Sequence, residues 1–537
     1  MAEKYDASIV GGGHNGLVCA FYLAKAGFSV RVLERRDVVG GAAVTEEFHP
    51  GFRNSIASYS VSLLNPMVIA DLELARHGLE IKVRPVPYFQ PHADGGYLMI
   101  DRDPDETRAQ IAKFSARDAD IYGSFHARLE RVCDFLRGLL LKTPPNHGGG
   151  LRQLLAGAAA ANHARRFGRE AQRDIYDLFT MSAGTLLDQW FESDALKGVL
   201  GFDAIIGSFV SPYSPGSAYV LLHHVFGEVN GVKGAWGHAV GGMGSITQAM
   251  ARACEEQGVE ITLGAAVGQV MTEAGAVRGV ELADGERIAS ERVVSNVNPK
   301  LLFCNLIAPE HLDDAFLRRM TQWTCGSGSF RMNVALSELP DFTALPGREP
   351  GKQHMASILI SPSLRYLDDA YLDARTRGWA RNPAIEMHIP SVIDDTLAPP
   401  GNHVASLFCQ QFAPELPDGR NWADHREEVA DLIIDTVTRY APNFRDAVVG
   451  RSALTPKDLE TKLGLVGGDI FHGALTLNQI YSARPALGHA DYRGPLRGLY
   501  MCGSGTHPGG GVTGVPGHNA AREILADRGG LFRRRAS

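Results

Sequence analysis

The chain has 537 residues, of which 45% are hydrophobic and 21% charged, and its formal net charge is −7. This length and apolar content supply enough core for more than one domain. Acidic and basic residues are interspersed without a long basic stripe, which argues against nucleic acid as a partner.

The seven cysteines are dispersed and form no C-x-x-C pair. This pattern is typical of free thiols in a reducing compartment, so we expect a cytoplasmic location. The first residues lack the basic and apolar regions of a secretory signal. No segment reaches the roughly 18 unbroken apolar residues of a membrane helix, so no integral membrane segment is expected. The apolar stretch 199–210 is interpreted as buried core, with a peripheral membrane contact as the alternative.

The first predicted unit is a strand, a glycine-rich turn, a helix and a second strand, over 6–10, 11–16, 13–25 and 28–33. Its turn has the spacing G-x-G-x-x-G, formed by Gly11, Gly13 and Gly16. In such a turn the first glycine permits the tight bend and the second lets the backbone approach a pyrophosphate. The third lets helix and strand pack closely, while the helix N-terminus attracts the phosphates. The unit therefore predicts a bound dinucleotide.

Glu34 ends the second predicted strand, and its carboxylate is expected to accept hydrogen bonds from the adenosine ribose hydroxyls. Its charge would repel a 2′-phosphate, so NADP is disfavoured although Arg35 and Arg36 follow. The motif alone does not separate FAD from NAD.

In the middle of the chain, amphipathic patterning predicts one or two helices over 105–141, a loop over 143–150 and an Ala-rich helix over 154–164. The stretch 211–237 is rich in Pro, Gly and aromatic residues, and is interpreted either as loops and strands that line a binding cavity or as a plain structural loop. His223 and His224 would point to opposite sides of a strand, and with His238 they form no known ligand spacing. No metal is therefore expected.

The later elements predict a return to the nucleotide-binding sheet. They are a helix over 245–258, a strand over 259–263, a hairpin from Val267 with a D-G turn at 284–285, and a strand over 292–296. Near the end of the chain, an apolar strand over 499–502 again enters a glycine-rich segment. Two such units far apart in sequence are expected when a chain leaves a nucleotide sheet and later completes it. No second G-x-G-x-x-G lies between a strand and a helix, so a separate NAD(P)H domain is not expected.

Together these features resemble the phytoene desaturase type of FAD oxidoreductase, a branch of the amine-oxidase and glutathione-reductase-like flavoproteins. Within it, the group called pyridine nucleotide-disulfide oxidoreductase domain-containing protein 2 is similar. The segments that carry the resemblance are 10–17, 40–45, 50–52, 214–224, 237–244, 293–296, 503–509 and 514–517. They span nearly the whole chain, apart from 330–469, where no motif is found.

The resemblance implies an α/β fold: a Rossmann-like FAD-binding domain of the glutathione reductase/amine oxidase type with an inserted α+β substrate domain. The FAD-binding domain would consist of residues 1–85, 237–305 and 486–530. The substrate domain would consist of residues 86–236 and 306–485.

The resemblance also implies the positions of FAD. The pyrophosphate would lie on Gly11, Gly13 and Gly16, the ribose on Glu34, and the adenine on the backbone of Val267. The other implied cofactor-binding residues are Arg35, Gly40, Gly41, Gly503, Ser504, Thr506, Val512, Thr513, Gly514 and Val515. The helix that begins near Gly514 would direct its positive end at the flavin and stabilise the anionic reduced ring.

The chain departs from its relatives at two motif positions. Ala42 follows Gly41 where many relatives have arginine, and Ser504 follows Gly503 where glutathione-reductase-like relatives have an acid. Because no C-x-x-C is present, dithiol chemistry is not expected.

The predicted function is that of an FAD-dependent oxidoreductase of dehydrogenase or desaturase type, which moves hydride between an apolar small molecule and flavin N5. His507, Tyr59 and His238 are the candidates for the accompanying proton, and His507 is equally interpretable as a packing residue. Oxygen or a quinone is the expected electron acceptor, and the resemblance implies a mitochondrial location if the source is eukaryotic. The alternatives are a flavin amine oxidase, and a redox-neutral isomerase or non-catalytic flavin-binding partner protein.

Overall fold

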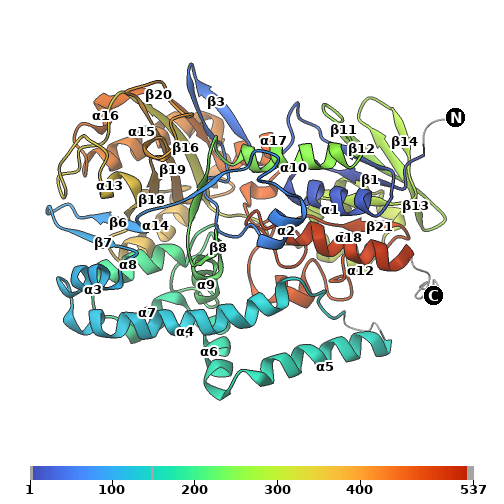
Figure 1. Ribbon diagram of the computed structural model, residues 1–537, viewed down its shortest axis with the longest axis horizontal. Coiled ribbons are helices and arrows are strands. Elements are labelled where there is room, and N and C mark those ends of the chain that lie inside the picture. Colours follow the sequence, from blue (N-terminus) through green and yellow to red (C-terminus); the bar gives the residue numbers. More distant parts are fainter. Residues whose placement is uncertain (1–3, 147–149, 529–537) are drawn as a thin grey trace.

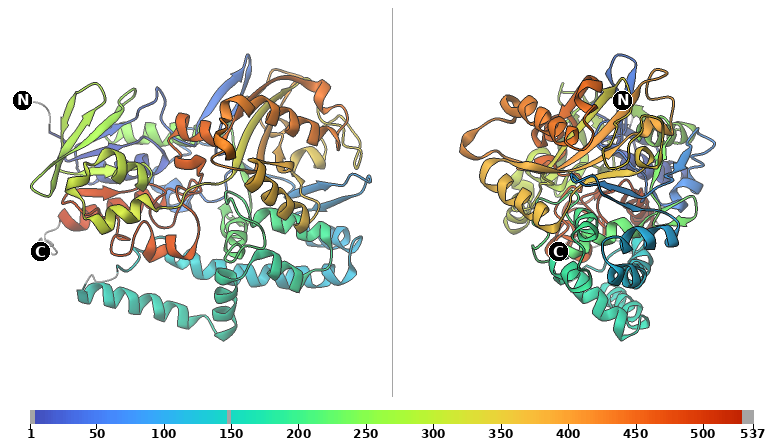
Figure 2. Two further views of the ribbon diagram at one scale, coloured as in Figure 1. Left: turned by 180° about the vertical axis from the view of Figure 1, so that it is seen from behind. Right: turned by 90° about the vertical axis from the view of Figure 1, so that its left-hand side faces the viewer.

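The computed structural model describes residues 4–146 and 150–528. Two lobes, each built on a β-sheet, lie side by side, and a layer of helices runs along one side of both (Figure 1). Figure 2 shows the same layer below the lobes from behind and from the end. Strand β1 (Ala7–Val10) and helix α18 (Val515–Arg528), from opposite ends of the described chain, lie in the same lobe.

The first lobe contains a five-stranded parallel sheet in the order β11-β2-β1-β15-β21. Its strands are β1, β2 (Val30–Leu33), β11 (Glu260–Thr262), β15 (Val293–Ser295) and β21 (Leu499–Met501). One face is covered by α1 (His14–Lys25), α10 (Gly244–Glu256) and α18, whose apolar side chains join one core. The other face packs on a smaller sheet of β12 (Val267–Glu273), β13 (Ala276–Leu282) and β14 (Arg287–Ala289). Coverage of both faces explains the continuous apolar runs of these strands.

The elements predicted for this lobe are confirmed within one or two residues. The strands and helices expected at 6–33, 245–263, 292–296 and 499–502 are all present, and α18 begins next to Gly514. The D-G turn at 284–285 joins β13 to β14.

The second lobe contains a seven-stranded mixed sheet in the order β20-β16-β19-β18-β17-β6-β7. Its strands are β6 (Tyr88–Pro91), β7 (Tyr97–Ile100), β16 (Ser329–Leu336), β17 (Ser357–Ile360), β18 (Trp379–His388), β19 (His403–Phe412) and β20 (Val448–Leu454). One face packs on α15 (Trp422–Thr438), and the other on α14 (Leu364–Arg377) and the helical layer. Strands β16 to β20 lie almost wholly in the region where the sequence offered no motif, whereas β6 and β7 come before it. Their buried residues are mostly apolar but include polar ones such as Arg331 and Glu386.

The helical layer consists of α3 (Pro104–Ala112), α4 (Ala116–Leu140), α5 (Gly150–Arg166), α6 (Arg169–Thr180), α7 (Ala183–Trp190), α8 (Asp194–Asp203) and α9 (Ala218–Phe226). The two helices predicted over 105–141 and the Ala-rich helix are confirmed, whereas part of the predicted loop over 143–150 lies outside the described residues. Among the described residues, no helix is long and apolar enough to cross a bilayer.

The interpretation of 211–237 as loops and strands was wrong for its middle. Residues 218–226 form helix α9, which therefore also contains His223 and His224. A short apolar run fits a strand as well as a helix. Here Leu221 and Leu222 are buried against the other helices, and this packing favours a helix. The hairpin of β8 (Glu228–Val229) and β9 (Val232–Lys233) follows it.

Candidate functional site

The two glycine-rich segments meet at one edge of the parallel sheet. Val10 of β1 pairs with Ser295 of β15, and Ser295 pairs with Met501 of β21. Gly11 and Gly503 therefore follow strands that end together, on either side of β15. A Cβ added to Gly503 would lie 2.5 Å from the carbonyl oxygen of Asn296, so this close approach requires glycine. The carboxyl ends of parallel strands are where such folds bind nucleotides.

The first glycine turn has the geometry that its spacing predicts. Gly11 has φ +97°, a conformation that favours glycine. A Cβ on Gly16 would lie 2.3 Å from the carbonyl oxygen of Gly11, and one on Gly13 would lie 2.8 Å from Nδ2 of Asn296. The backbone of the turn is thus open on the side where a pyrophosphate approaches.

Gly40 and Gly41 form a second turn that lies against the first. The amide of Gly40 donates to the carbonyl oxygen of Gly12 at 2.9 Å. A Cβ on Gly40 would lie 2.5 Å from the carbonyl oxygen of Ala43, and one on Gly41 would lie 3.4 Å from Cα of Gly13. The structure thus brings the turn of Gly40 and Gly41 and the G-x-G-x-x-G turn to one place.

Glu34 is buried beside the first turn. Its Oε2 accepts from the amide of Gly12 at 2.8 Å and its Oε1 from the amide of Arg36 at 3.0 Å. The carbonyl oxygen of Glu34 accepts from the amide of Ala265 at 2.8 Å, two residues before Val267 of β12. These bonds fix the carboxylate and bring the start of β12 next to it.

The arginines after Glu34 point in different directions. Arg35 is exposed, and its Nη2 donates to the carbonyl oxygens of Thr461 and Lys462, at 3.2 and 2.8 Å, at the end of α17 (Pro456–Leu463). Arg36 pairs with Glu46, and its Nη1 is buried without a hydrogen-bond partner among the described residues. The side chain of Arg35 is thus directed towards the end of α17, and its contact with FAD stays a prediction.

Helices α1 and α18 begin at this same edge. Nδ2 of Asn15 donates to Oγ of Ser504 at 3.2 Å, and a Cβ on Gly517 would lie 2.2 Å from the carbonyl oxygen of Asn15. At the start of α18, Oγ1 of Thr513 accepts from the amide of Val515 at 3.1 Å. Two positive helix ends therefore point into one site, which favours a ligand with several negative charges.

The remaining predicted residues of the second segment are buried around this start. The hydroxyl of Thr506 donates to the carbonyl oxygen of Gly503 at 2.8 Å. Gly514 has φ +73° and Val512 has φ +58°. Positive φ is rare for a β-branched residue, and such strain is concentrated at binding and catalytic sites.

Arg484 is a buried cation beside the second glycine segment that the sequence did not reveal. It is fully buried, and all five of its N–H groups donate to backbone carbonyl oxygens. The acceptors are Phe471, Gly473, Gln479 and Ser504, the last of which accepts two bonds. Burial lowers the pKa of Arg484 to about 10, so the side chain stays cationic. A lone arginine in a loop without a motif carries no signal of such a role.

The three predicted proton carriers lie in separate surroundings, each with a partner of its own. His507 bonds through Nε2 to the carbonyl oxygen of Leu139 at 3.2 Å, and burial lowers its pKa to about 4. Nε2 of His238 lies 2.7 Å from Oδ2 of Asp394. Each of these side chains is bonded to a different partner, and the three do not form one cluster.

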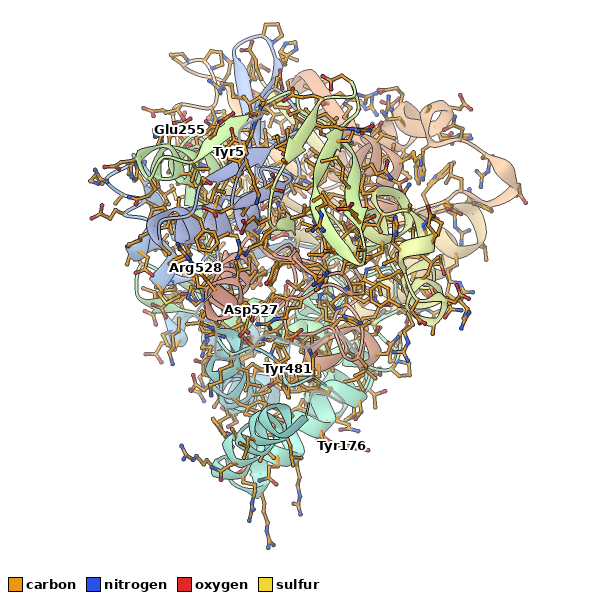
Figure 3. All side chains as sticks on the ribbon, turned by 90° about the vertical axis from the view of Figure 1, so that its right-hand side faces the viewer. Tyr5, Tyr176, Glu255, Tyr481, Asp527 and Arg528 are labelled. Atoms are coloured by element: carbon orange, nitrogen blue, oxygen red, sulfur yellow. The ribbon has the colours of Figure 1, made fainter. Side chains whose placement is uncertain are left out.

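Tyr59 donates its hydroxyl proton to Glu386 and stacks on Phe408 with ring centres 5.4 Å apart. The guanidinium of Arg331 lies 4.4 Å from the ring centre of Tyr59. Burial, followed by the charge of Glu386, raises the pKa of Tyr59. The ring centres of His507 and Tyr481 lie 5.3 Å apart. Figure 3 labels Tyr481 between Asp527 of α18 and Tyr176 of α6.

Several buried polar atoms near the glycine turns have no hydrogen-bond partner among the described residues. They are Nε2 of His14, Oδ1 of Asn15, Nη1 of Arg36 and Nδ1 of His472. Buried polar atoms in folded proteins are nearly always satisfied, so such a cluster indicates a polar ligand. His14 stands inside the first glycine motif, where sequence reasoning treated it as a spacer, whereas no sequence signal marked His472.

A cavity of about 770 Å³ lies between the helical layer and the sheet of the second lobe. Apolar side chains form much of its wall: Pro87, Ile100, Ala119, Leu129, Val199, Leu200, Leu221, Val225 and Trp236. Arg84, Tyr88, Tyr122, Asp203, Ser357 and Glu386 also line it. The hydroxyl of Tyr88 donates to Asp203, with oxygen distances of 3.0 and 3.2 Å. Among the described residues, no group of three or more histidine, cysteine or acidic side chains is arranged to hold a metal.

A parallel sheet with paired glycine turns, two converging helix N-termini and a buried acid fixed beside the first turn is the arrangement of an FAD-dependent oxidoreductase of Rossmann type. The unsatisfied polar atoms and the space left by the glycines fit this cofactor. The sequence pattern of the flavin containing amine oxidoreductases matches residues 16–328, and the chain belongs to that family. Its cofactor is FAD.

Other proteins share nearly the whole length of the chain. The rat (Rattus norvegicus) pyridine nucleotide-disulfide oxidoreductase domain-containing protein 2 is 41% identical over 98% of this chain and 94% of its own. The lycopene-forming phytoene desaturase of Pantoea ananas is 27% identical over 95% of this chain and 96% of its own. The crystal structure of an oxidoreductase from Methanosarcina mazei shares the fold, with a TM-score of 0.58 and 16% identity, covering 97% of this chain and 99% of that one. The family resemblance expected from the motifs is thereby confirmed.

Proposed function

We propose that the chain oxidises an apolar small molecule by transferring hydride from a substrate C–H bond to N5 of FAD. The observation that carries this proposal is the cavity of about 770 Å³, whose wall includes a group of aliphatic side chains from α8 and α9. This volume lies within the roughly 300–1,000 Å³ of cavities that bind organic ligands. Phytoene, named in one of the relatives, is a hydrocarbon.

The cavity adjoins the cofactor site through one short segment. The amide of Ser58 donates to the carbonyl oxygen of Ala42 at 3.0 Å, which ties this segment to the turn at Gly40 and Gly41. The next residue, Tyr59, donates its hydroxyl proton to Glu386, which lines the cavity. A substrate in the cavity could therefore contact Glu386, which is connected through Tyr59 and Ser58 to the cofactor-binding turn.

Each part of the chain would have a defined task. The turns at Gly11, Gly13 and Gly16 would hold the pyrophosphate, Glu34 the ribose, and the start of β12 at Val267 the adenine. The flavin would lie along the second glycine segment, at Gly503, Ser504, Thr506, Val512, Thr513, Gly514 and Val515. The bound cofactor supplies the hydride-accepting chemistry, and the chain orients the substrate and excludes water.

Amine oxidation is a second candidate, supported by the polar end of the cavity. Six carboxyl groups line it, and two of them, the buried ones of Asp203 and Glu386, accompany the rings of Tyr88 and Tyr122. Burial and then the charge of Glu386 raise the pKa of Asp203. A protonated amine would relieve this repulsion and would be attracted by the aromatic faces.

Oxygen or a quinone would reoxidise the flavin. An apolar substrate and a quinone are both soluble in lipid, so a peripheral contact with a membrane, mitochondrial if the source is eukaryotic, would suit the first candidate.

The test is an absorption spectrum of the purified protein, repeated after anaerobic addition of a polyene or terpene and of primary or methylated amines. Loss of the oxidised flavin band with the hydrocarbon supports the first candidate, and loss with the amine alone selects the second. Flavin that neither class nor a mild reductant can bleach would contradict both and favour a redox-neutral role.

A further inference from the structure

Two imidazoles, those of His14 and His472, differ from the other candidate histidines in their free ring nitrogens. Nε2 of His14 and Nδ1 of His472 are buried and have no hydrogen-bond partner among the described residues. By contrast, His507 and His238 are bonded to Leu139 and Asp394. His14 is the first residue of α1, inside the glycine turn that receives the cofactor.

His472 is held against the second glycine segment by Arg484. Nη2 of Arg484 donates to the carbonyl oxygen of Phe471 at 2.6 Å, and Nη1 to that of Gly473 at 3.3 Å. The guanidinium thus binds the peptide groups on both sides of His472, and it also binds Ser504. The carbonyl oxygen of His472 itself accepts from Nε1 of Trp323 at 3.1 Å. The position of the ring is therefore fixed relative to the flavin segment.

Burial is the main reason that both rings are neutral. Burial, followed by the charge of Arg484, lowers the pKa of His472 to about 4. Burial, followed by the influence of His472, lowers the pKa of His14 to about 3, so the two rings lie close enough to sense each other. The carboxyl of Asp469, three residues before His472, is buried, which raises its pKa, and it accepts from the amides of Gly326 and Phe471. A neutral ring in this setting gains a proton only when new negative charge appears beside it.

We propose that the pair of His14 and His472 takes up the proton that accompanies reduction of the bound flavin, with His472 as the acceptor and Arg484 as its positioning residue. This inference rests on the proposed hydride transfer. As the substrate forms its new double bond, the hydride with its electron pair goes to N5 and the second hydrogen leaves as a proton to Nδ1 of His472. The flavin gains one negative charge and the imidazole one positive charge. On reoxidation, oxygen or a quinone takes both electrons and both protons.

The test needs no substrate. The midpoint potential of the bound FAD is measured between pH 6 and 8 by equilibration with reference dyes. For a two-electron couple each proton taken up contributes about 30 mV per pH unit, so two protons give about 60 mV. We expect a slope near 60 mV in the unmodified protein and near 30 mV in the double variant His14→Asn with His472→Asn. His507→Asn is the matched control, and its slope should stay near 60 mV.

Two results would overturn the inference: a slope near 30 mV in the unmodified protein, or a slope near 60 mV that persists in the double variant. FAD content is read from the spectrum of each sample, and if the double variant loses FAD, His472→Asn alone must show the smaller slope. Failure of the proposed function is distinguishable, because it would appear as no bleaching by any substrate while these slopes are unaffected.

Discussion

The guanidinium of Arg484 donates two hydrogen bonds to the carbonyl oxygen of Ser504, from Nε at 3.2 Å and from Nη2 at 2.8 Å. The same group binds carbonyl oxygens of residues 471, 473 and 479. A single buried cation thus joins the loop that carries His472 to the second glycine segment. Such a clamp fixes two irregular segments that have no regular secondary structure to hold them.

Replacement of Arg484 is expected to loosen this clamp. Arg484→Ala leaves four buried carbonyl oxygens without these hydrogen bonds, so the free energy of unfolding should fall by about 3–5 kcal/mol. Arg484→Lys keeps the charge but not the planar fork, and should cost about 1–3 kcal/mol. Urea unfolding measures both, with the exposed Arg365→Ala as the control. Equal stability of Arg484→Ala and the control would contradict the clamp.

Gly517 lets α18 pack directly on α1, since a Cβ there would lie 2.2 Å from the carbonyl oxygen of Asn15. Gly517→Ala should therefore separate the two helix N-termini, lower stability by about 1–3 kcal/mol and reduce the FAD content of the purified protein. Gly123→Ala in α4 is the matched control, because nothing lies within 4 Å of its added Cβ. The control should be neutral or more stable by about 0.5–1 kcal/mol. Full FAD content in Gly517→Ala would contradict this account of the packing.

Glu34 and Arg35 are adjacent but should differ in their effect on FAD binding. Glu34→Gln removes the buried carboxylate, and a lost hydrogen bond to a charged group of about 1.5–3 kcal/mol weakens FAD binding by about 10- to 150-fold. Arg35→Ala should change the dissociation constant less than threefold, because that side chain binds the end of α17. Reconstitution of the apoprotein, followed by flavin fluorescence, measures both constants. A larger effect for Arg35→Ala would restore the original prediction for that residue.

Buried His507 should make stability fall as the pH falls below neutrality. Burial lowers its folded-state pKa to about 4, while an unfolded histidine titrates near 6.5. Between these values the unfolded state binds more protons, so lowering the pH from 7 to 5 removes about 2 kcal/mol of stability through this residue. In His507→Gln the loss over that range should be smaller by this amount. Unfolding curves at both pH values test it, and an unchanged pH dependence would show that the ring is not buried in neutral form.

The glycine positions were predictable because their requirement is local. Gly11 and Gly16 are needed wherever a strand turns sharply into a helix that packs back on it, and that demand leaves a fixed spacing in the sequence. The helices and strands of the nucleotide lobe were predictable for the same reason. The middle of the chain was harder, since the short apolar run 218–226 fits either a strand or a helix until its neighbours are known.

Which candidate side chain keeps a free ring nitrogen was not predictable from residue type. His507, His238 and Tyr59 have suitable chemistry, yet each already holds a partner that lies distant in sequence: Leu139, Asp394 and Glu386. His14 and His472 were overlooked because a spacer in a motif and a loop residue carry no pattern. Whether a ring nitrogen is free depends on contacts that only the folded chain defines.

The sequence by itself determined the nucleotide-binding units, because these depend on backbone geometry that only certain residues allow. Its motifs along the chain indicated the family by resemblance, and with it the cofactor class. The tertiary structure decided which arginine lies beside Glu34, which histidines keep a free nitrogen, and how Arg484 joins two loops. These outcomes depend on long-range packing and on the balance between desolvation and charge at buried positions. Neither factor produces a repeating pattern in the sequence.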